Sequence, residues 1–240
     1  MKMNRGKTTT FVACLFALVL VAGCASTKVT DRQSFVTGAL PRPGIIWVYD
    51  FAATAADVPP DSALANQYAI DTTPQTPEQI AEGRKLGAKI AADLVGRIQA
   101  MGMPASRAYV GTKPRLNDIV LRGYLISVKP GSAAKRVVIG FGSGASELKT
   151  AVEGYQMTAR GLRKLGSGAV QAGGGKTPGA AVGAATFAAT ANPAGLIITS
   201  AAKIYGEASG NSKLEGRAEA SVKQIAKVLK QRFREQGWIN

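Results

Sequence analysis

Apolar residues recur at helical spacing in two segments of the chain. The first segment opens with Thr76 and Pro77, which suit the N-cap and the first helical position, and Gln79 occupies the capping-box position. Its apolar stripe consists of Ile80, Leu86, Ile90, Leu94, Ile98 and Met101. Residues three and four positions apart lie on one face of a helix. We therefore predict a helix from Pro77 whose Ile90 and Leu94 side chains lie in the core.

The second helical pattern lies within residues 216–236. Its apolar positions are Val222, Ile225, Leu229 and Phe233, at steps of three and four residues. Gly237 is a typical helix stop, and we expect Trp238 and Ile239 to fold back onto the core.

Short runs rich in β-branched and aromatic residues predict the strands. They cover residues 44–51, 106–110, 119–128, 136–141 and 147–158. Prolines make residues 52–75 a long loop. A strand, a helix, several strands and a helix in this order favour an α/β fold, with α+β as the alternative, in which a single mixed sheet is covered by two main helices.

Residues 166–210 are predicted to form a Gly/Ala-rich insert, helical or hairpin-shaped, and residues 177–202 within it carry no charged side chain. One interpretation is membrane insertion, since each arm around Asn192 and Pro193 is near the length of a membrane-spanning strand. The arms do not alternate polar and apolar residues, however, and they are poor in leucine and phenylalanine. We therefore favour a small-residue segment packed on its own domain.

The N-terminal residues have the form of a bacterial export signal. Cationic residues precede an uncharged apolar run from Phe11 to Val21, which is too short to span a bilayer. The letters VAGC at its end fit the lipobox of bacterial lipoproteins, which predicts that Cys24 becomes the acylated N-terminal residue. Ala25 stands where an aspartate retains many such proteins at the inner membrane, so we expect an outer-membrane anchor with the domain facing the periplasm.

These features divide the chain into three parts. Residues 1–23 are the signal peptide, residues 24–43 are a lipidated tether, and residues 44–240 are a periplasmic domain that includes the insert. The tether is predicted from its polar composition, which lacks a sustained apolar period.

The chain is strongly basic, with a formal net charge of +15. Its lysines and arginines are scattered, without a block of like charge or interleaved aromatic residues for base stacking. Nucleic-acid binding is therefore not expected of an exported protein. An anionic envelope polymer would suit a basic surface by long-range attraction, although such a surface also serves solubility alone.

The sequence contains no histidine, which excludes the usual general base, the Ser-His-Asp and Cys-His arrangements and nearly all zinc sites. Cys14 lies in the signal and the Cys24 sulfur would carry lipid. The carboxylates are scattered, and Asp50, at the end of a predicted strand, is expected to cap the following turn. The glycine-rich segments at 140–144 and 175–177 lack the spacing of nucleotide-binding loops. We expect no catalytic residue, no metal ligand and no cofactor.

The segment from Arg136 to Leu148 resembles the signature of a bacterial lipoprotein family called domain of unknown function 4410. The lipobox and the ending from Gln236 to Ile239 after a basic helix resemble the same family. This resemblance covers most of residues 44–240 and implies neither an assigned activity nor catalytic residues. The layout is more loosely similar to the periplasmic domain of curli secretion channel lipoproteins, which implies a scaffold or assembly role.

The expected function is that of a non-enzymatic outer-membrane lipoprotein with a periplasmic binding or assembly role. Its partners would be the membrane, through the lipid on Cys24, and an envelope protein or further copies of itself. The alternative is an oligomeric membrane-inserting channel or export component. A hydrolase with a hydroxyl or carboxylate nucleophile ranks last.

Overall fold

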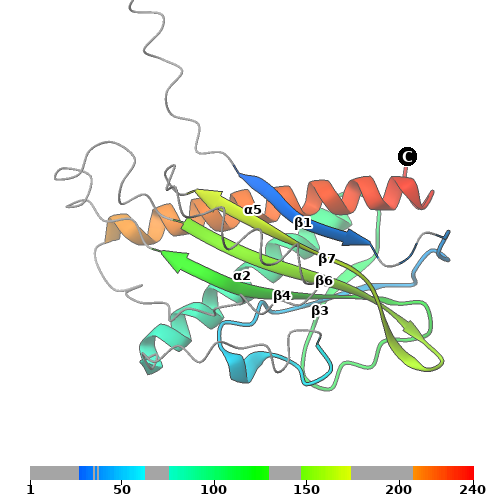
Figure 1. The fold of residues 1–240 in the computed structure, drawn as a ribbon, viewed down its shortest axis with the longest axis horizontal. Helices are drawn as coiled ribbons and strands as arrows, with labels where there is room; N and C mark the ends of the chain where they lie inside the picture. Colours follow the sequence, from blue (N-terminus) through cyan, green and yellow to red (C-terminus); the bar gives the residue numbers. More distant parts are fainter. Residues whose placement is uncertain (1–26, 35, 37, 63–75, 130–146, 174–207) are drawn as a thin grey trace, which may run out of the picture.

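A computed structural model describes residues 27–34, 36, 38–62, 76–129, 147–173 and 208–240. The predicted export signal with Cys24, the strand predicted at 136–141, the glycine-rich segments and residues 177–202 lie outside these ranges. The described residues form one mixed sheet with two long helices on one of its faces (Figure 1). The predicted fold class is confirmed.

The sheet has six strands in the order β1-β7-β6-β4-β2-β3. Their bounds are Lys28–Ser34 for β1, Ile46–Tyr49 for β2, Ala105–Ala108 for β3, Ile119–Lys129 for β4, Glu147–Thr158 for β6 and Gly161–Gly173 for β7. Strand β2 pairs in parallel with β3 and β4, and the other pairs are antiparallel. The parallel pair of β2 and β3 is possible because the helix between these two strands returns the chain to the same end of the sheet.

The two helices are α2, Pro77–Gln99, and α5, Ala208–Glu235. Helix α2 begins as predicted: the Thr76 side chain accepts a hydrogen bond from the Gln79 backbone, and the Gln79 side chain accepts one from the Thr76 backbone. Ile90 and Leu94 are fully buried, which confirms the predicted core face. A short 3-10 turn, Ala55–Asp57, lies in the segment predicted as a long loop.

The main core lies between the helices and the sheet. Phe51 fills its centre, where its backbone N–H donates to the Gly87 carbonyl of α2 at 3.2 Å. A side chain at Gly87 would overlap the Phe51 carbonyl, and one at Gly123 on β4 would overlap the Phe51 ring. The glycines at positions 87 and 123 therefore let α2 and β4 approach Phe51.

Trp238 folds back onto the core as predicted and packs against Phe233, with ring centroids 5.6 Å apart.

The structure corrects three boundaries. Residues Lys28–Ser34, predicted as part of a flexible tether, form the edge strand β1 on β7. Residues 166–173, assigned to the insert, continue strand β7, which the sequence pattern missed. Helix α5 begins at Ala208 rather than near residue 216. For the two strands, pairing with distant segments outweighs weak local propensity.

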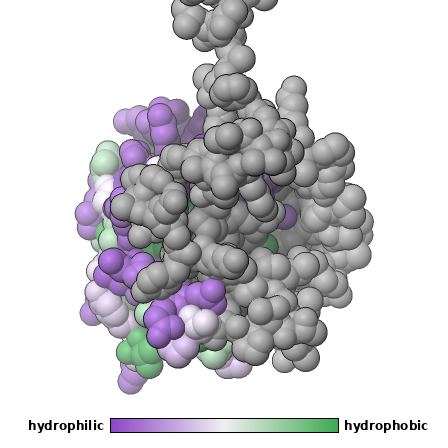
Figure 2. Space-filling view, turned by 90° about the vertical axis from the view of Figure 1, so that its left-hand side faces the viewer, coloured by the Kyte–Doolittle hydropathy of each residue, from purple (hydrophilic) through white to green (hydrophobic). Residues whose placement is uncertain are grey.

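Among the described residues, no helix combines the length and the apolar content needed to cross a bilayer. On the face seen in Figure 2, the described surface is mostly hydrophilic, and its hydrophobic residues form only small patches.

Candidate functional site

The two faces of the sheet differ in chemistry. Along β4, Ile119 and Leu121 point toward the helices and join the main core, whereas Arg122 and Tyr124 point to the opposite face. This alternation follows from the two-residue period of a strand. The helix side holds an apolar cavity, and the opposite side holds a buried polar cluster.

The cavity lies between the sheet and α5 and has a volume of about 180 Å³. Its apolar lining from the sheet includes Val29, Ile119, Leu121, Val152, Leu165 and Val170. Helix α5 contributes Ile225, Val228, Leu229 and Phe233. A water molecule needs about 10–15 Å³ of such volume, so the space would hold on the order of a dozen waters. Apolar walls bond water poorly, so the cavity suits an apolar group better.

Glycines on the sheet account for this space. Gly168 of β7 and Gly154 of β6 both line the cavity. A Cβ atom added at Gly168 would meet nothing within 4 Å, and one at Gly154 would make only an ordinary contact with Leu121 at 3.6 Å. Glycine inside a strand weakens the strand and often marks a close approach of a ligand or another backbone. The cavity therefore exists because side chains are missing from its roof.

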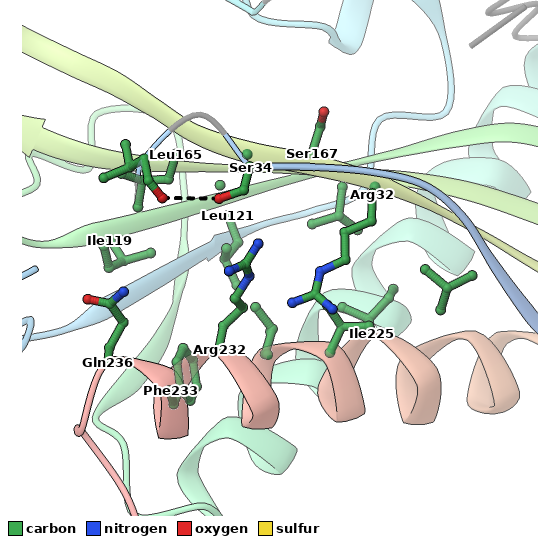
Figure 3. A pocket seen from close by; sticks show the side chains of 18 of the residues that line it. Arg32, Ser34, Ile119, Leu121, Leu165, Ser167, Ile225, Arg232, Phe233 and Gln236 are labelled. Carbon is green, nitrogen blue, oxygen red and sulfur yellow. Dashed lines mark hydrogen bonds between the residues drawn. The ribbon is translucent and has the colours of Figure 1, made fainter. Parts of the chain in front are cut away.

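The edge of the cavity carries charge. Arg32 extends from β1 and Arg232 from α5 into the space between sheet and helix (Figure 3). Glu235 pairs with Arg232 at 2.8 Å and lies 3.9 Å from Arg32. The Arg32 and Arg232 side chains are 34% and 37% exposed, so they stand between the cavity and solvent. We call Arg32, Arg232 and Glu235 the charged rim.

The segment before β2 closes the cavity next to Trp238. The Leu40 backbone N–H donates to Gln236 Oε1 at 2.6 Å, and the Trp238 indole donates to the Leu40 carbonyl at 3.1 Å. Leu40, Gln236 and Trp238 all line the cavity. Hydrogen bonds between residues nearly 200 positions apart thus fix this wall.

The polar cluster on the opposite face is centred on Glu153, which is 1% exposed. Its Oε2 atom accepts hydrogen bonds from the hydroxyls of Ser62, Tyr124 and Tyr155 at 2.9, 2.8 and 2.7 Å. Its Oε1 atom accepts one from the Lys164 ammonium at 2.6 Å. Both carboxylate oxygens are thus engaged within the fold.

These contacts shift the titration of the cluster. Burial by itself raises the pKa of Glu153, but the hydrogen bonds from Lys164 and the tyrosines, with the Lys164 charge, outweigh burial and hold the pKa below its usual value. Burial and the neighbouring carboxylate raise the pKa of Tyr124, so its hydroxyl keeps its proton and remains a donor. Glu153 is therefore ionised, and both of its oxygens accept hydrogen bonds from side chains of the same domain. This arrangement suits a structural role better than catalysis.

Arg122 borders the same cluster. Its Nη2 donates to Asp61 at 3.0 Å, and its guanidinium lies 5.1 Å from the centre of the Tyr155 ring. Its buried Nε has no hydrogen-bond partner in the described part of the chain. The aromatic ring partly compensates for this burial through a cation–π contact.

The residues that the sequence analysis singled out, Asp50 and Cys24, belong neither to the cavity nor to the polar cluster as described. Asp50 does not cap the following turn as predicted. Its carboxylate instead accepts hydrogen bonds from Arg107 on the neighbouring strand β3, the shortest at 2.6 Å. Cys24 lies outside the described residues and stays a prediction. The described residues contain no group of three or more carboxylates or cysteines that could hold a metal ion.

Sequence reasoning missed both the cavity and the polar cluster. Arg32 was assigned to the predicted tether, and no sequence pattern distinguished Glu153 from the other scattered carboxylates. The only available signal was the glycine content of residues 154–168 within an otherwise strand-like stretch.

A protein-family model described as a domain of unknown function (DUF4410) matches residues 46–191. No curated protein matches the chain. Among solved structures, a dodecamer of a PelC variant from Paraburkholderia phytofirmans is 14% identical, with a TM-score of 0.36, and the match covers 72% of this chain and 98% of that one. A second PelC dodecamer from the same organism is 14% identical with a TM-score of 0.32, covering 70% and 97%. Similarity at this level carries no argument for function or assembly.

Proposed function

The chain belongs to the DUF4410 family, and we propose that it is a non-enzymatic lipoprotein of the outer membrane. Its proposed role is to bind an apolar ligand in the cavity between the sheet and α5. The lipobox ending at Cys24 supports the anchor and Ala25 supports the outer membrane. The cavity supports the binding role.

The observation that carries the binding role is a pocket with mostly apolar walls between the sheet and α5, which is partly open to solvent. Apolar side chains of a folded domain normally pack closely against one another, so an unfilled apolar pocket of this size leaves room for a ligand. Here the space lies beside Gly154 and Gly168, where a large side chain would fill it. Ligand sites are concave and mostly apolar with a few polar groups, and the cavity with its charged rim has this composition.

A non-enzymatic role is supported by the chemistry available. The sequence has no histidine, and the Glu153 carboxylate is held by four donors from its own fold. Among the described residues that line the cavity, none carries a carboxylate. The proposed function is therefore to hold a molecule rather than to transform it.

The test uses the uncharged dye N-phenyl-1-naphthylamine, whose fluorescence rises in apolar surroundings. The full chain carries Cys24→Ser throughout, so that no acyl group on that residue competes for the cavity. We expect the dye to bind this protein and Gly168→Ala, and to lose most of its signal with Gly168→Leu, which fills the space. Equal signals from Gly168→Leu and Gly168→Ala, with both variants folded by circular dichroism, would place the dye elsewhere and refute the proposal.

A series of linear alcohols makes the test quantitative. Each buried methylene contributes about 0.8 kcal/mol, so the concentration that displaces the dye should fall about fourfold per added carbon until the cavity is full. Displacement that does not depend on chain length would contradict binding in an apolar cavity.

A further inference from the structure

The charged rim indicates what kind of molecule the cavity takes. The rim carries two guanidinium groups and one carboxylate, so its net charge is positive. Arg232 is held by Glu235 at 2.8 Å. The 3.9 Å between Arg32 and Glu235 is beyond hydrogen-bond distance. Within the described part of the chain, the Arg32 guanidinium therefore has donors to offer to a ligand.

We propose that the cavity binds a single-chain amphiphile with an anionic head group, its alkyl chain among the apolar walls and its head between Arg32 and Arg232. This inference rests on the proposed function, because it requires the cavity to be a binding site. A carboxylate or a phosphate head would suit the rim, since both accept paired hydrogen bonds from a guanidinium.

The positions of the two arginines support this orientation. Both line the cavity, and both are about one-third exposed. A head group at the rim would keep part of its hydration while it gains hydrogen bonds from both sides, one from the strand and one from the helix (Figure 3). Leu40 and Trp238 close one wall of the cavity, and among the described lining residues Arg32 and Arg232 are the ones that carry a charge.

The size of the cavity favours one chain over two. A volume of about 180 Å³ accommodates on the order of a dozen waters, which corresponds to one alkyl chain of roughly ten carbons. A two-chain phospholipid would leave its second chain in solvent.

The experiment compares three ligands with the same ten-carbon chain: decanoate, 1-decanol and decylammonium. Each displaces the uncharged dye from the Cys24→Ser chain at neutral pH, below its micellar concentration. We expect decanoate to bind about tenfold or more tightly than 1-decanol, because a hydrogen bond to a charged group is worth a tenfold change or more. Decylammonium should bind the least tightly.

Three variants locate the effect. Arg32→Gln and Arg232→Gln should each lower the affinity for decanoate about tenfold and leave that for 1-decanol unchanged. Glu235→Gln should raise the decanoate affinity, since it releases Arg232. Lys230→Gln is the matched control, because Lys230 is an exposed cation of the same helix that does not line the cavity. It should leave the preference for the anion intact.

Two outcomes overturn the inference. If 1-decanol binds as tightly as decanoate, the charged rim does not distinguish an anionic head group from an uncharged one. The proposed apolar binding site would be unaffected by that result. If Lys230→Gln weakens decanoate as much as Arg232→Gln does, the preference reflects overall charge rather than the rim. Failure of the proposed function is distinguishable from both, because then the dye itself would bind Gly168→Leu and Gly168→Ala alike.

Discussion

Glu153 is a carboxylate with almost no exposed surface, and its charge depends on a few neighbours. The Lys164 side chain is 26% exposed and holds one oxygen, while three hydroxyls hold the other. Because these contacts lower the pKa of Glu153 in the folded state, the ionised form stabilises the fold. That stabilisation is fully present above the ordinary glutamate pKa of 4.5 and is lost as the pH falls through the lower folded value.

We predict that Glu153→Gln destabilises the protein by about 3 kcal/mol at pH 7, because breaking a buried ion pair leaves its partner uncompensated. The difference from the unsubstituted protein should shrink as the pH falls below 4.5. Urea unfolding at several pH values between neutral and acid measures this. Glu219→Gln is the control, since that side chain is 73% exposed and 3.7 Å from Arg97, and surface pairs are worth less than about 1 kcal/mol. A Glu153→Gln deficit that is constant with pH would contradict the pKa argument.

At the scale of elements, α2 shows how a residue that is poor for a helix can still be required. Gly87 costs the helix about 1 kcal/mol relative to alanine by intrinsic propensity. Its missing side chain nevertheless lets the Phe51 backbone come close enough to donate a hydrogen bond to the Gly87 carbonyl. Gly96, on the same helix, is exposed, and a Cβ there would meet nothing within 4 Å.

The two glycines therefore predict opposite results for the same substitution. Gly87→Ala should destabilise the protein by about 2 kcal/mol or more, because overpacking outweighs the gain in propensity. Gly96→Ala should stabilise it by about 0.5–1 kcal/mol. Chemical denaturation of both variants decides the matter. A stabilising Gly87→Ala would show that α2 does not pack on Phe51 as described.

The elements also show which parts of the fold were readable from the sequence. Helix α2 was predicted because its cap, its first proline and its apolar stripe are all local signals. Strands β1 and β7 were missed because β1 is an edge strand with the mostly polar sequence KVTDRQS, and β7 has glycines where it roofs the cavity. Their strand conformation comes from pairing with each other and with β6.

The site was harder to predict because its members are far apart in the sequence. Arg32 and Arg232 line the same cavity because β1 pairs with the edge of the sheet next to the last turns of α5. The Glu153 cluster likewise gathers Ser62, Tyr124 and Lys164 from three segments. Neither arrangement leaves a spacing pattern in the chain.

At the scale of the whole molecule, the strand β1 changes how the predicted anchor would hold the domain. A tether over residues 24–43 would let the domain swing away from the membrane. With β1 beginning at Lys28, only three residues separate that strand from Cys24, and the four steps from Cys24 to Lys28 reach about 14 Å at full extension. A lipidated Cys24 would therefore hold the sheet edge that carries Arg32 close to the bilayer, where single-chain amphiphiles partition.

We predict that Cys24→Ser releases the protein from the membrane fraction without detergent, and that mass spectrometry of the unsubstituted protein finds an acylated Cys24 at the mature N-terminus. The reason is that the lipobox makes Cys24 the predicted point of lipid attachment, and the acyl chains would be the principal hold on the membrane. Ala189→Asp in the Cys24→Ser background separates the alternative. If Cys24→Ser stays with the membrane and the added charge then releases it, residues 177–202 insert, because a charge in the bilayer costs several kcal/mol. That result would favour the channel over the binding protein.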